Sequence, residues 1–397
     1  MTKFLPLTAL GLFAALCFCV FVACNKDSAP EVTQSAVEKT FNGKIDLNNL
    51  YAYAGQSVPG FITKDNSAGN TITDKGATLG RVLFYDKSLS VNNTVSCGSC
   101  HRQEFAFSDT SVASKGVNGT TGRHSMRLVN ARFGQEGKFF WDERAATLED
   151  QTTQPIKDHS EMGFSGKNGD PSINDLITKL KAVDYYKELF TFAYGTDEIT
   201  EQKMKLALAQ FVRSISSFDS KYDAGRALVP NDGANFSNFT AQENNGKNIF
   251  LTPPQFNASG VRIGGGLGCA GCHRPPEFDI DPNSRSNGIA GSINGGGPDF
   301  TNTRSPSLRN LVRIDGTVNG PMMHTGVIKD LQTAIGHYGN LTAQAINNPN
   351  LDPRLKPNGI GQQLNVTTPE VNSVVAFLRT LSGTDVYTNP KWSDPFQ

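Results

Sequence analysis

Cys97-Gly98-Ser99-Cys100-His101 and Cys269-Ala270-Gly271-Cys272-His273 are the two stretches of this 397-residue chain that decide its fold. A Cys-x-x-Cys pair alone also suits a redox disulfide or half of a zinc site. The histidine after each pair points to haem instead, because the two thiols add to the porphyrin vinyl groups and the adjacent imidazole then reaches the iron. The sequence therefore predicts two c-type haems, bound through Cys97, Cys100, Cys269 and Cys272, with His101 and His273 as proximal ligands.

The residues around the two motifs are also alike. Gly80-Arg81-Val82-Leu83-Phe84 precedes the first motif much as Gly246-Lys247-Asn248-Ile249-Phe250 precedes the second. This similarity indicates an internal duplication. We therefore expect an N-terminal haem domain over residues 60–230 and a C-terminal haem domain over residues 231–397, because Asp232-Gly233-Ala234-Asn235 interrupts the helical patterns.

Helix signals dominate the rest of the chain. Thr240 and Glu243 form a capping-box pattern that opens one helix, and another starts with Thr368 as its cap and stops at Gly383. A third helix has an apolar face made of Met204, Leu208, Phe211 and Ile215. The expected fold class is mainly α, with two c-type cytochrome domains, each with one covalently bound haem, joined by long loops.

Residues 1–24 have the pattern of an export signal. Residues 4–23 are apolar and end in a small residue directly before Cys24, which is typical of a lipoprotein signal peptide cleaved at Cys24. A retained anchor and ordinary cleavage stay open. All three interpretations place the body in the periplasm or cell envelope, and the first attaches it to a membrane by lipid. Residues 25–59 are polar and are expected to form a tether.

Cysteine and charge counts argue against other classes of protein. Three of the seven cysteines lie in the leader, which leaves the four motif cysteines and no spare pair for a disulfide. The chain has 37 basic and 37 acidic residues, a formal net charge of zero. Nothing therefore argues for nucleic acid or an anionic membrane surface as a partner.

Ordered motifs after each haem site point to a family. The first set includes Phe140-Trp141-Asp142-Glu143-Arg144 and Glu161-Met162-Gly163, and the second set is Thr303-Arg304-Ser305-Pro306-Ser307-Leu308-Arg309-Asn310 and Pro321-Met322-Met323-His324-Thr325-Gly326. In this order they resemble the bacterial dihaem cytochrome c peroxidases and the related MauG proteins. The resemblance implies that the haem at His101 reduces peroxide and that the haem at His273 receives electrons from a donor.

The resemblance also implies roles for single residues. Glu161 matches the glutamate that moves protons during peroxide cleavage, a task suited to a carboxylate near the iron. Gln151 matches a second polar residue of the same distal pocket. Trp141 matches the tryptophan between the haems, where an aromatic ring offers a route for electrons. Arg144 is expected to be structural and to pair with a carboxylate or a haem propionate.

Two departures from the family pattern bear on the first haem. Family members that need reductive activation have a blocking histidine where this chain has Gly116, so the first haem is expected to stay open unless His124 or His159 moves in. His124 stands where the family usually has a calcium-binding asparagine, and imidazole is a poor partner for a hard cation. A calcium ion between the haems would then rely on the carbonyl oxygens of Asn319 and Pro321.

A third departure concerns the sixth ligand of the second haem. Tyr338 stands where typical peroxidases have methionine and where MauG proteins have tyrosine. A phenolate favours the ferric and higher oxidation states, whereas methionine raises the reduction potential. Tyr338 is the expected ligand, with Met322, Met323 and His337 as alternatives, and His324 is expected to be a pocket residue.

Three functions follow as hypotheses. The first is a dihaem peroxidase that reduces hydrogen peroxide to water, with electrons that enter through the C-terminal haem from a small cytochrome c, a copper protein or a quinol system. The second is a MauG-like oxidase of a protein or organic substrate, which Tyr338 favours. The third is a dihaem electron carrier, against which the Glu161 motif and the missing histidine at Gly116 argue. The oligomeric state is not determined by the sequence, and a homodimer stays open.

Overall fold

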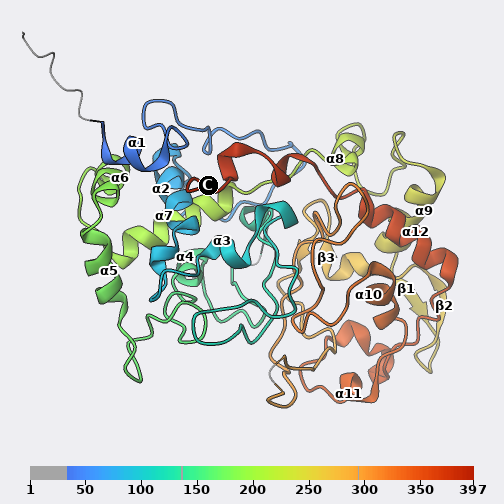
Figure 1. Cartoon of the computed structure of the whole chain (residues 1–397). Helices are drawn as coiled ribbons and strands as arrows, with labels where there is room; N and C mark the ends of the chain where they lie inside the picture. The colour runs from blue at the N-terminus through green and yellow to red at the C-terminus, as the bar shows by residue number, and fades with distance from the viewer. Residues whose placement is uncertain (1–33, 136, 294) are drawn as a thin grey trace, which may run out of the picture. The chain divides into compact units, whose positions relative to one another are not determined.

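The computed structural model describes residues 34–135, 137–293 and 295–397. Within these ranges the chain is mainly helical and has two short two-stranded antiparallel sheets, β1 with β2 and β3 with β4 (Figure 1). The helices are α1 (Ala36–Phe41), α2 (Asp74–Tyr85), α3 (Cys97–Cys100), α4 (Leu148–Thr152), α5 (Ile173–Lys181), α6 (Asp184–Tyr194), α7 (Glu201–Ser214), α8 (Lys221–Arg226), α9 (Ala241–Leu251), α10 (Leu331–His337), α11 (Ala343–Ile346) and α12 (Thr368–Arg379). The strands are β1 (Pro254–Phe256), β2 (Arg262–Gly265), β3 (His273–Arg274) and β4 (Asp279–Ile280).

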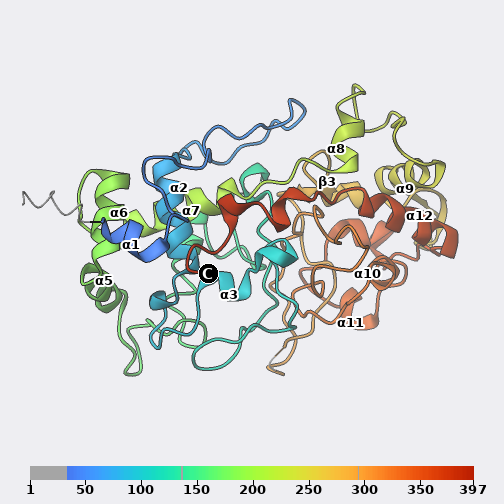
Figure 2. The same cartoon turned by 45° about the horizontal axis from the view of Figure 1, so that its top comes forward.

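Two helix pairs built in the same way support the two haem motifs. α2 packs along α7, and α9 packs along α12 (Figures 1 and 2). Each pair meets at a glycine: a Cβ at Gly80 would collide with the carbonyl of Ala207, and a Cβ at Gly246 would collide with the carbonyl of Ser373. The repeated glycines of the sequence are therefore the points where the two backbones of each pair approach most closely.

The described residues form two hydrophobic cores. The first is built mainly from residues 37–215, and the second from residues 222–381. Val386 and Trp392 near the C-terminus belong to the first core rather than the second. The end of the range 231–397, which we expected to belong to the C-terminal domain, thus returns to the N-terminal core.

The helix signals of the sequence agree with the structure except at the two ends of α12, which has a different cap from the expected one and ends at Arg379 rather than at Gly383. Thr240 caps α9 in a capping box with Glu243, and Met204, Leu208 and Phe211 are buried on α7. The expected cap Thr368 is instead the first residue of α12. Thr367 is the cap, because its hydroxyl accepts from the N–H of Glu370 while the Glu370 carboxylate accepts from the Thr367 N–H.

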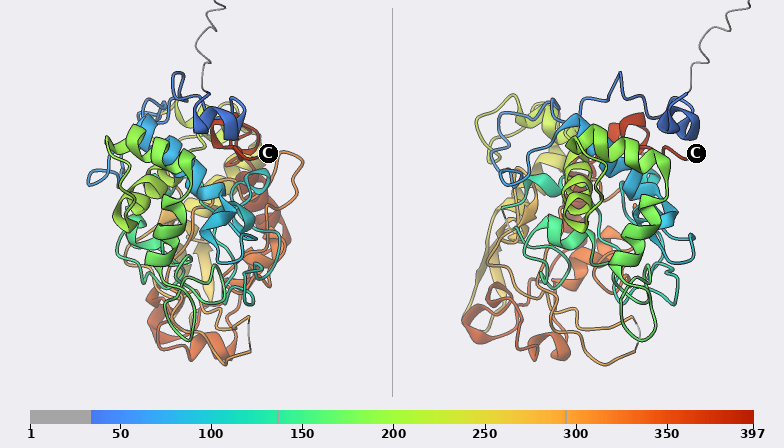
Figure 3. Two further views of the ribbon diagram at one scale, coloured as in Figure 1. Left: turned by 60° about the vertical axis from the view of Figure 1, so that its left-hand side comes forward. Right: turned by 90° about the vertical axis from the view of Figure 1, so that its left-hand side faces the viewer.

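The N-terminal segment expected to be a tether is folded where the structure describes it. Ser35 caps α1, and Val37 and Phe41 of this helix are buried in the first core. The Phe41 ring packs edge-on against Phe396 at 5.1 Å, so the C-terminal segment lies beside α1 (Figure 3). Four buried apolar side chains in residues 35–53 outweigh the polar composition of the segment: Val37, Phe41, Ile45 and Tyr53.

The expected signal peptide and the lipid site at Cys24 lie outside the described residues. Across the described part of the chain, none of the helices combines the length and apolar character needed to span a bilayer.

Candidate active site

The first haem motif is held by a short helix and a tight turn. Cys97 and Cys100 lie at the two ends of α3, and His101 follows directly. The chain then turns back, so that Phe107, at a positive φ of 59°, places its carbonyl 3.2 Å from Nδ1 of His101. A backbone acceptor on Nδ1 fixes the imidazole and leaves Nε2 for a metal, which is the usual arrangement of a histidine ligand. Burial lowers the pKa of His101, so the neutral form needed for ligation is favoured.

Glu161 and Gln151 lie in the same pocket as this motif. A pocket of about 80 Å³ is lined by Cys97, Cys100 and His101 together with Gln151 and Glu161. Burial, and to a smaller extent the nearby carboxylate of Asp158, raises the pKa of Glu161 to about 7, against an opposing effect of Arg144. A carboxyl group with a pKa near neutrality can both accept and return a proton at physiological pH.

Glu161 also faces a second, more polar pocket of about 240 Å³. Its lining consists of Arg144, Gln154, Pro155, Lys157, Asp158 and Glu161. The Glu161 carboxylate therefore borders both the motif pocket and this outer one. Arg144, expected to be structural, pairs with Asp142 at 2.8 Å and lies over the Phe140 ring.

Gly116 lines the motif pocket at the position where a blocking histidine is absent. A Cβ at Gly116 would meet the carbonyl of Ser160 and would lie 2.8 Å from Cα of Glu161. The next residue, Val117, donates its N–H to the Glu161 carbonyl at 3.0 Å. This close packing leaves no room for any side chain at residue 116.

The two other histidines proposed to move in are held elsewhere. Nδ1 of His124 lies 3.0 Å from the carbonyl of Ser111, and Nδ1 of His159 lies 2.7 Å from a carboxylate oxygen of Asp170. Among the described lining residues of the pocket, His101 is the only histidine.

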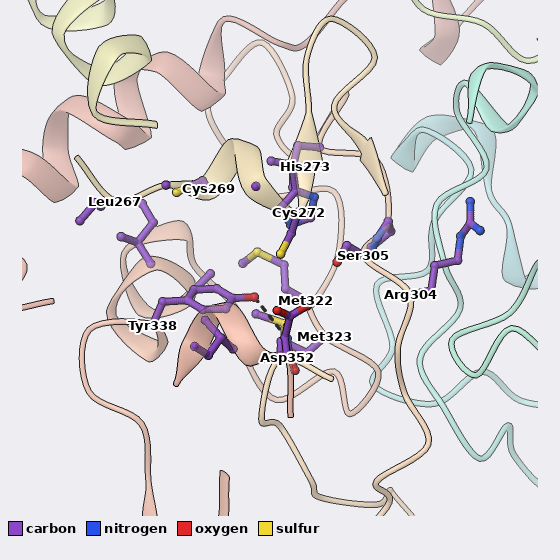
Figure 4. Close-up of a pocket in the computed structure, with 18 of the residues that line it drawn as sticks. Leu267, Cys269, Cys272, His273, Arg304, Ser305, Met322, Met323, Tyr338 and Asp352 are labelled. Atoms are coloured by element: carbon purple, nitrogen blue, oxygen red, sulfur yellow. Dashed lines mark hydrogen bonds between the residues drawn. The ribbon is translucent and has the colours of Figure 1, made fainter. Parts of the chain in front are cut away.

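The second haem motif opens onto a larger cavity. This cavity, about 510 Å³, is lined by Cys269, Cys272 and His273 and, on another side, by Met322, Met323 and Tyr338. Figure 4 shows the Tyr338 hydroxyl directed towards the two methionines, below the loop that carries Cys272 and His273. Burial lowers the pKa of His273 to about 4, which keeps its imidazole neutral.

Three candidate sixth ligands thus border the second cavity, and the fourth does not. Tyr338, Met322 and Met323 belong to the lining, whereas His337 does not, and its Nε2 lies 2.9 Å from the carbonyl of Asn287. His324 lines the cavity as expected, and its Nε2 lies 2.9 Å from the carbonyl of Gly291.

The donor groups at both motifs suit a covalently attached haem. The four motif cysteines are free thiols, and each pair precedes a half-buried imidazole whose lowered pKa favours the neutral form. The second cavity has the volume that a large planar cofactor needs. The first pocket is narrower, so a haem there requires its lining side chains to move apart. Leu267, Leu308, Ile335 and Leu364 provide apolar walls for the second cavity.

Arg127 is a cavity residue that the sequence analysis missed. It borders the larger cavity, and its guanidinium donates to the carbonyls of Ser307 and Arg309, both at 3.1 Å. Burial lowers its pKa to about 10, and no carboxylate pairs with it among the described ion pairs. A half-buried cation of this kind at the edge of the cavity suits a haem propionate. The sequence signal for Arg127 is its position in the family-like stretch after the first motif, three residues before Asn130.

Trp141 connects the two halves. Its indole N–H donates to the His124 carbonyl at 2.8 Å, and its own carbonyl accepts from the N–H groups of Thr303 and Arg304 at 2.9 and 3.0 Å. The ring is buried and borders the larger cavity, where it packs edge-on to His324 at 6.2 Å. Ser125, next to His124, lines both pockets. The segment of His124 and Ser125, to which the Trp141 indole is hydrogen-bonded, therefore borders both motif pockets.

The calcium ion stays an expectation from the family resemblance. Pro321 borders the larger cavity, and the Asn319 side chain donates to Asn310 and Tyr387, both at 2.7 Å. In the described ranges, no group of three or more histidine, cysteine or acidic side chains is arranged to hold a metal ion.

Comparisons with known proteins agree with this geometry. Residues 74–227 match the family described as di-haem cytochrome c peroxidase. The methylamine utilization protein MauG of Methylorubrum extorquens is 30% identical over 322 residues, which cover 79% of this chain and 79% of that protein. The cytochrome c551 peroxidase of Nitrosomonas europaea is 26% identical over 322 residues, which cover 77% of this chain and 80% of that protein.

Solved structures show the same fold. The crystal structure of a MauG-like protein associated with microbial copper homeostasis has a TM-score of 0.64 at 26% identity and covers 86% of this chain and 99% of that one. The diheme peroxidase BthA from Burkholderia thailandensis has a TM-score of 0.56 at 21% identity, covering 86% and 96%, and supports the fold alone. From the two haem motifs, the paired helices and these similarities, we conclude that this chain belongs to the enzyme family of di-haem cytochrome c peroxidases and MauG proteins.

Proposed function

We propose that this protein is a di-haem peroxidase that reduces hydrogen peroxide to water at the first haem motif. The observation that carries the proposal is the position of Glu161, whose carboxylate shares a pocket with Cys97, Cys100 and His101 and also borders the outer polar pocket. An electron carrier has no need of an acid–base group beside its haem. The proposal is supported by the family membership of the chain.

Glu161 acts as the proton carrier in this proposal. A bound haem supplies the iron at which peroxide binds and its O–O bond breaks. Glu161 accepts a proton from the inner peroxide oxygen and returns it to the leaving oxygen, which departs as water. Gln151 lines the same pocket and offers an amide that can orient the substrate by hydrogen bonding. Gly116, which packs against the backbone of Ser160 and Glu161, leaves this part of the pocket free of a blocking side chain.

The second motif is proposed as the entry point for electrons. Trp141 borders the cavity of this motif, and its indole is fixed to the backbone of His124, beside Ser125, which lines both pockets. An aromatic ring held at this place supports electron transfer between the two sites. We propose a small cytochrome c, a copper protein or a quinol system as donor, and a location in the cell envelope with a lipid at Cys24.

A second candidate is a MauG-like oxidase of a protein or organic substrate. The observation that favours it is Tyr338, which borders the second cavity together with His273. A phenolate ligand stabilises the ferric and higher oxidation states, so oxidising equivalents could be kept for a slow organic substrate rather than being quenched by donor electrons.

The experiment compares purified di-haem protein with two glutamate variants. Peroxide is added to the fully oxidised protein, and electronic and spin-resonance spectra are recorded with time. Glu161→Gln removes the proposed proton carrier, and Glu104→Gln changes an exposed glutamate close to the same motif. We expect an immediate reaction in the unmodified protein and in Glu104→Gln, and a reaction slowed about 10²-fold or more in Glu161→Gln.

The outcomes separate the functions. If both haems are low-spin and peroxide has no effect even after one-electron reduction, the enzyme proposal fails and an electron carrier becomes the better account. If the product of the peroxide reaction decays slowly without a cytochrome donor, the oxidase is favoured over the peroxidase.

A further inference from the structure

The side chain of Asn287 contacts two of the candidate ligands of the second haem at once. Its amide nitrogen lies 3.3 Å from the hydroxyl oxygen of Tyr338 and 3.2 Å from the sulfur of Met323. All three residues line the cavity that contains His273. One amide group thus brings together a phenol and a thioether in the space that faces the proximal histidine.

The orientation of this amide is fixed by contacts on its other side. The Asn287 side-chain oxygen accepts from the N–H of Ile289 at 3.1 Å, so the nitrogen must point into the cavity. The Asn287 carbonyl contacts Nε2 of His337 at 2.9 Å, which ties it to the helix just before Tyr338.

The loop around Asn287 is also clamped. Ser286 is buried, its N–H donates to the carbonyl of Asn350 at 3.0 Å, and its carbonyl accepts from Asp352 at 2.9 Å. A Cβ at the following Gly288, which has a φ of +89°, would lie 2.8 Å from Cβ of Ala345. A side chain on such a rigid support can hold a partner in one geometry.

We propose that Asn287 is a positioning residue for the second haem, which holds Tyr338 as the distal ligand and keeps Met323 beside it as the alternative. The inference rests on the proposed function in taking Tyr338 as that ligand. Asn287 does not bind the iron in this arrangement. It donates to the phenol oxygen, which limits the rotation of the ring and draws electron density away from the oxygen.

This arrangement has a consequence for the reduction potential of the second haem. A hydrogen bond to a coordinating oxygen weakens its donation to the iron, and hydrogen bonds to ligands are a means by which proteins tune haem potentials. Loss of the Asn287 amide should therefore strengthen the phenolate and move the potential of the second haem to more negative values. The first haem, which has its own pocket, should keep its potential.

The test uses four variants of the full di-haem protein. Asn287→Leu removes the amide. Asn287→Ser gives a side chain too short to contact the Tyr338 hydroxyl, but its own hydroxyl can still accept from the N–H of Ile289. Gln362→Leu is the matched control, because the Gln362 amide donates to the main-chain carbonyl of Tyr338 at 2.8 Å and not to its phenol. Tyr338→Phe tests the ligand itself. Potentials of both haems are measured by spectroelectrochemistry, and ligation by resonance Raman and spin-resonance spectra.

The expected result is a negative shift of the second potential in both Asn287 variants, with no shift for the first haem. A thioether-ligated spectrum in place of the tyrosinate signature, with a potential shifted to more positive values, would contradict the expected strengthening of the phenolate. Gln362→Leu should leave both quantities unchanged.

Two other results would overturn the proposal in distinguishable ways. If Tyr338→Phe alters the ferric spectrum of the second haem but both Asn287 variants leave its potential and ligation unchanged, Asn287 has no positioning role and the ligand assignment stands. If Tyr338→Phe leaves that spectrum unchanged, the ligand assignment fails and the inference fails with it. An equal shift in Gln362→Leu would show that only the rigidity of the loop matters.

Discussion

The two halves of the molecule share a scaffold and differ in what faces the proximal histidine. In each half a helix pair meets at a glycine, Gly80 or Gly246, and an asparagine with positive φ reaches the end of the second helix of the pair. The N–H of Asn130 donates to Ile215 at 2.9 Å, and the N–H of Asn310 donates to Leu381 at 3.3 Å. The helical support of each motif is thus built twice from the same parts.

The distal sides have diverged. The first pocket has a carboxyl group and an amide, Glu161 and Gln151, and no histidine besides His101 in its described lining. The second cavity has a phenol and two thioethers, Tyr338, Met322 and Met323. The difference teaches that the duplicated helices support both motifs in the same way, whereas the residues to which the proposed function gives proton transfer or axial ligation come from segments outside these helices.

Removal of the proximal ligands should have the largest effect and would test this division directly. We expect His101→Gly to abolish the reaction with peroxide completely, because the site next to Glu161 loses its ordered iron. His273→Gly should retain the first spectral response to peroxide but lose turnover with a reduced donor. Stopped-flow spectra with and without donor make the comparison. Equal loss of the first response in both variants would contradict separate roles for the two halves.

Filling the two glycine contacts should be the next largest effect. Gly80→Ala and Gly246→Ala each force a methyl group against a backbone carbonyl, so each should reduce the free energy of unfolding by about 1–3 kcal/mol. Denaturant titrations of the haem-loaded protein measure the change. Gly55→Ala is the control, since a Cβ there has no neighbour within 4 Å. Stability unchanged in one of the two glycine variants would show that the halves are not built alike.

The rate of the peroxide reaction should change about tenfold with pH, and this change should depend only on Glu161 in the first half of the molecule. Burial raises the pKa of Glu161 from 4.5 to about 7, so this residue is mostly protonated at pH 6 and mostly ionised at pH 8. Because the ionised form accepts the peroxide proton, the rate should rise about tenfold over this range. Rates measured in stopped-flow across the interval provide the test. Glu161→Gln should show a flat profile, and a flat profile in the unmodified protein would remove Glu161 as the proton acceptor.

The smallest effect should come from the caps of the two matching helices. Thr73 caps α2 and also contacts the Gln210 side chain at 3.0 Å, whereas Thr240 caps α9 within a local, exposed capping box. Each substitution by alanine should cost about 1 kcal/mol of unfolding free energy, with the larger loss for Thr73→Ala because Gln210 loses a partner. Thermal unfolding of the two variants compares them. A larger loss for Thr240→Ala would contradict this ranking.

Local patterns predicted much of the scaffold. The capping box at Thr240, the apolar face of α7 and the repeated glycines depend on residues within one helix or one contact, so they can be read along the chain. The cap of α12 is Thr367 and not Thr368. Both neighbouring threonines carry a hydroxyl that could cap the helix, and the reciprocal pairing with Glu370 selects Thr367. The fold of residues 35–53 escaped prediction because its support comes from α6 and from the C-terminal segment, with hydrogen bonds that span 151 and 338 positions of the chain.

The sequence by itself determined the chemistry of haem attachment. Each of the two motifs has two thiols and an imidazole within five consecutive residues, so that all three groups can act on one haem. It also pointed to Glu161, Gln151, Trp141 and Tyr338 through their motifs. Only the tertiary structure decided which pocket each of them lines, that His337 lies outside the lining of the second cavity, and that Asn287 contacts both Tyr338 and Met323. These contacts join residues 36–51 positions apart through loops without regular periodicity, so their geometry is set by packing rather than by local sequence.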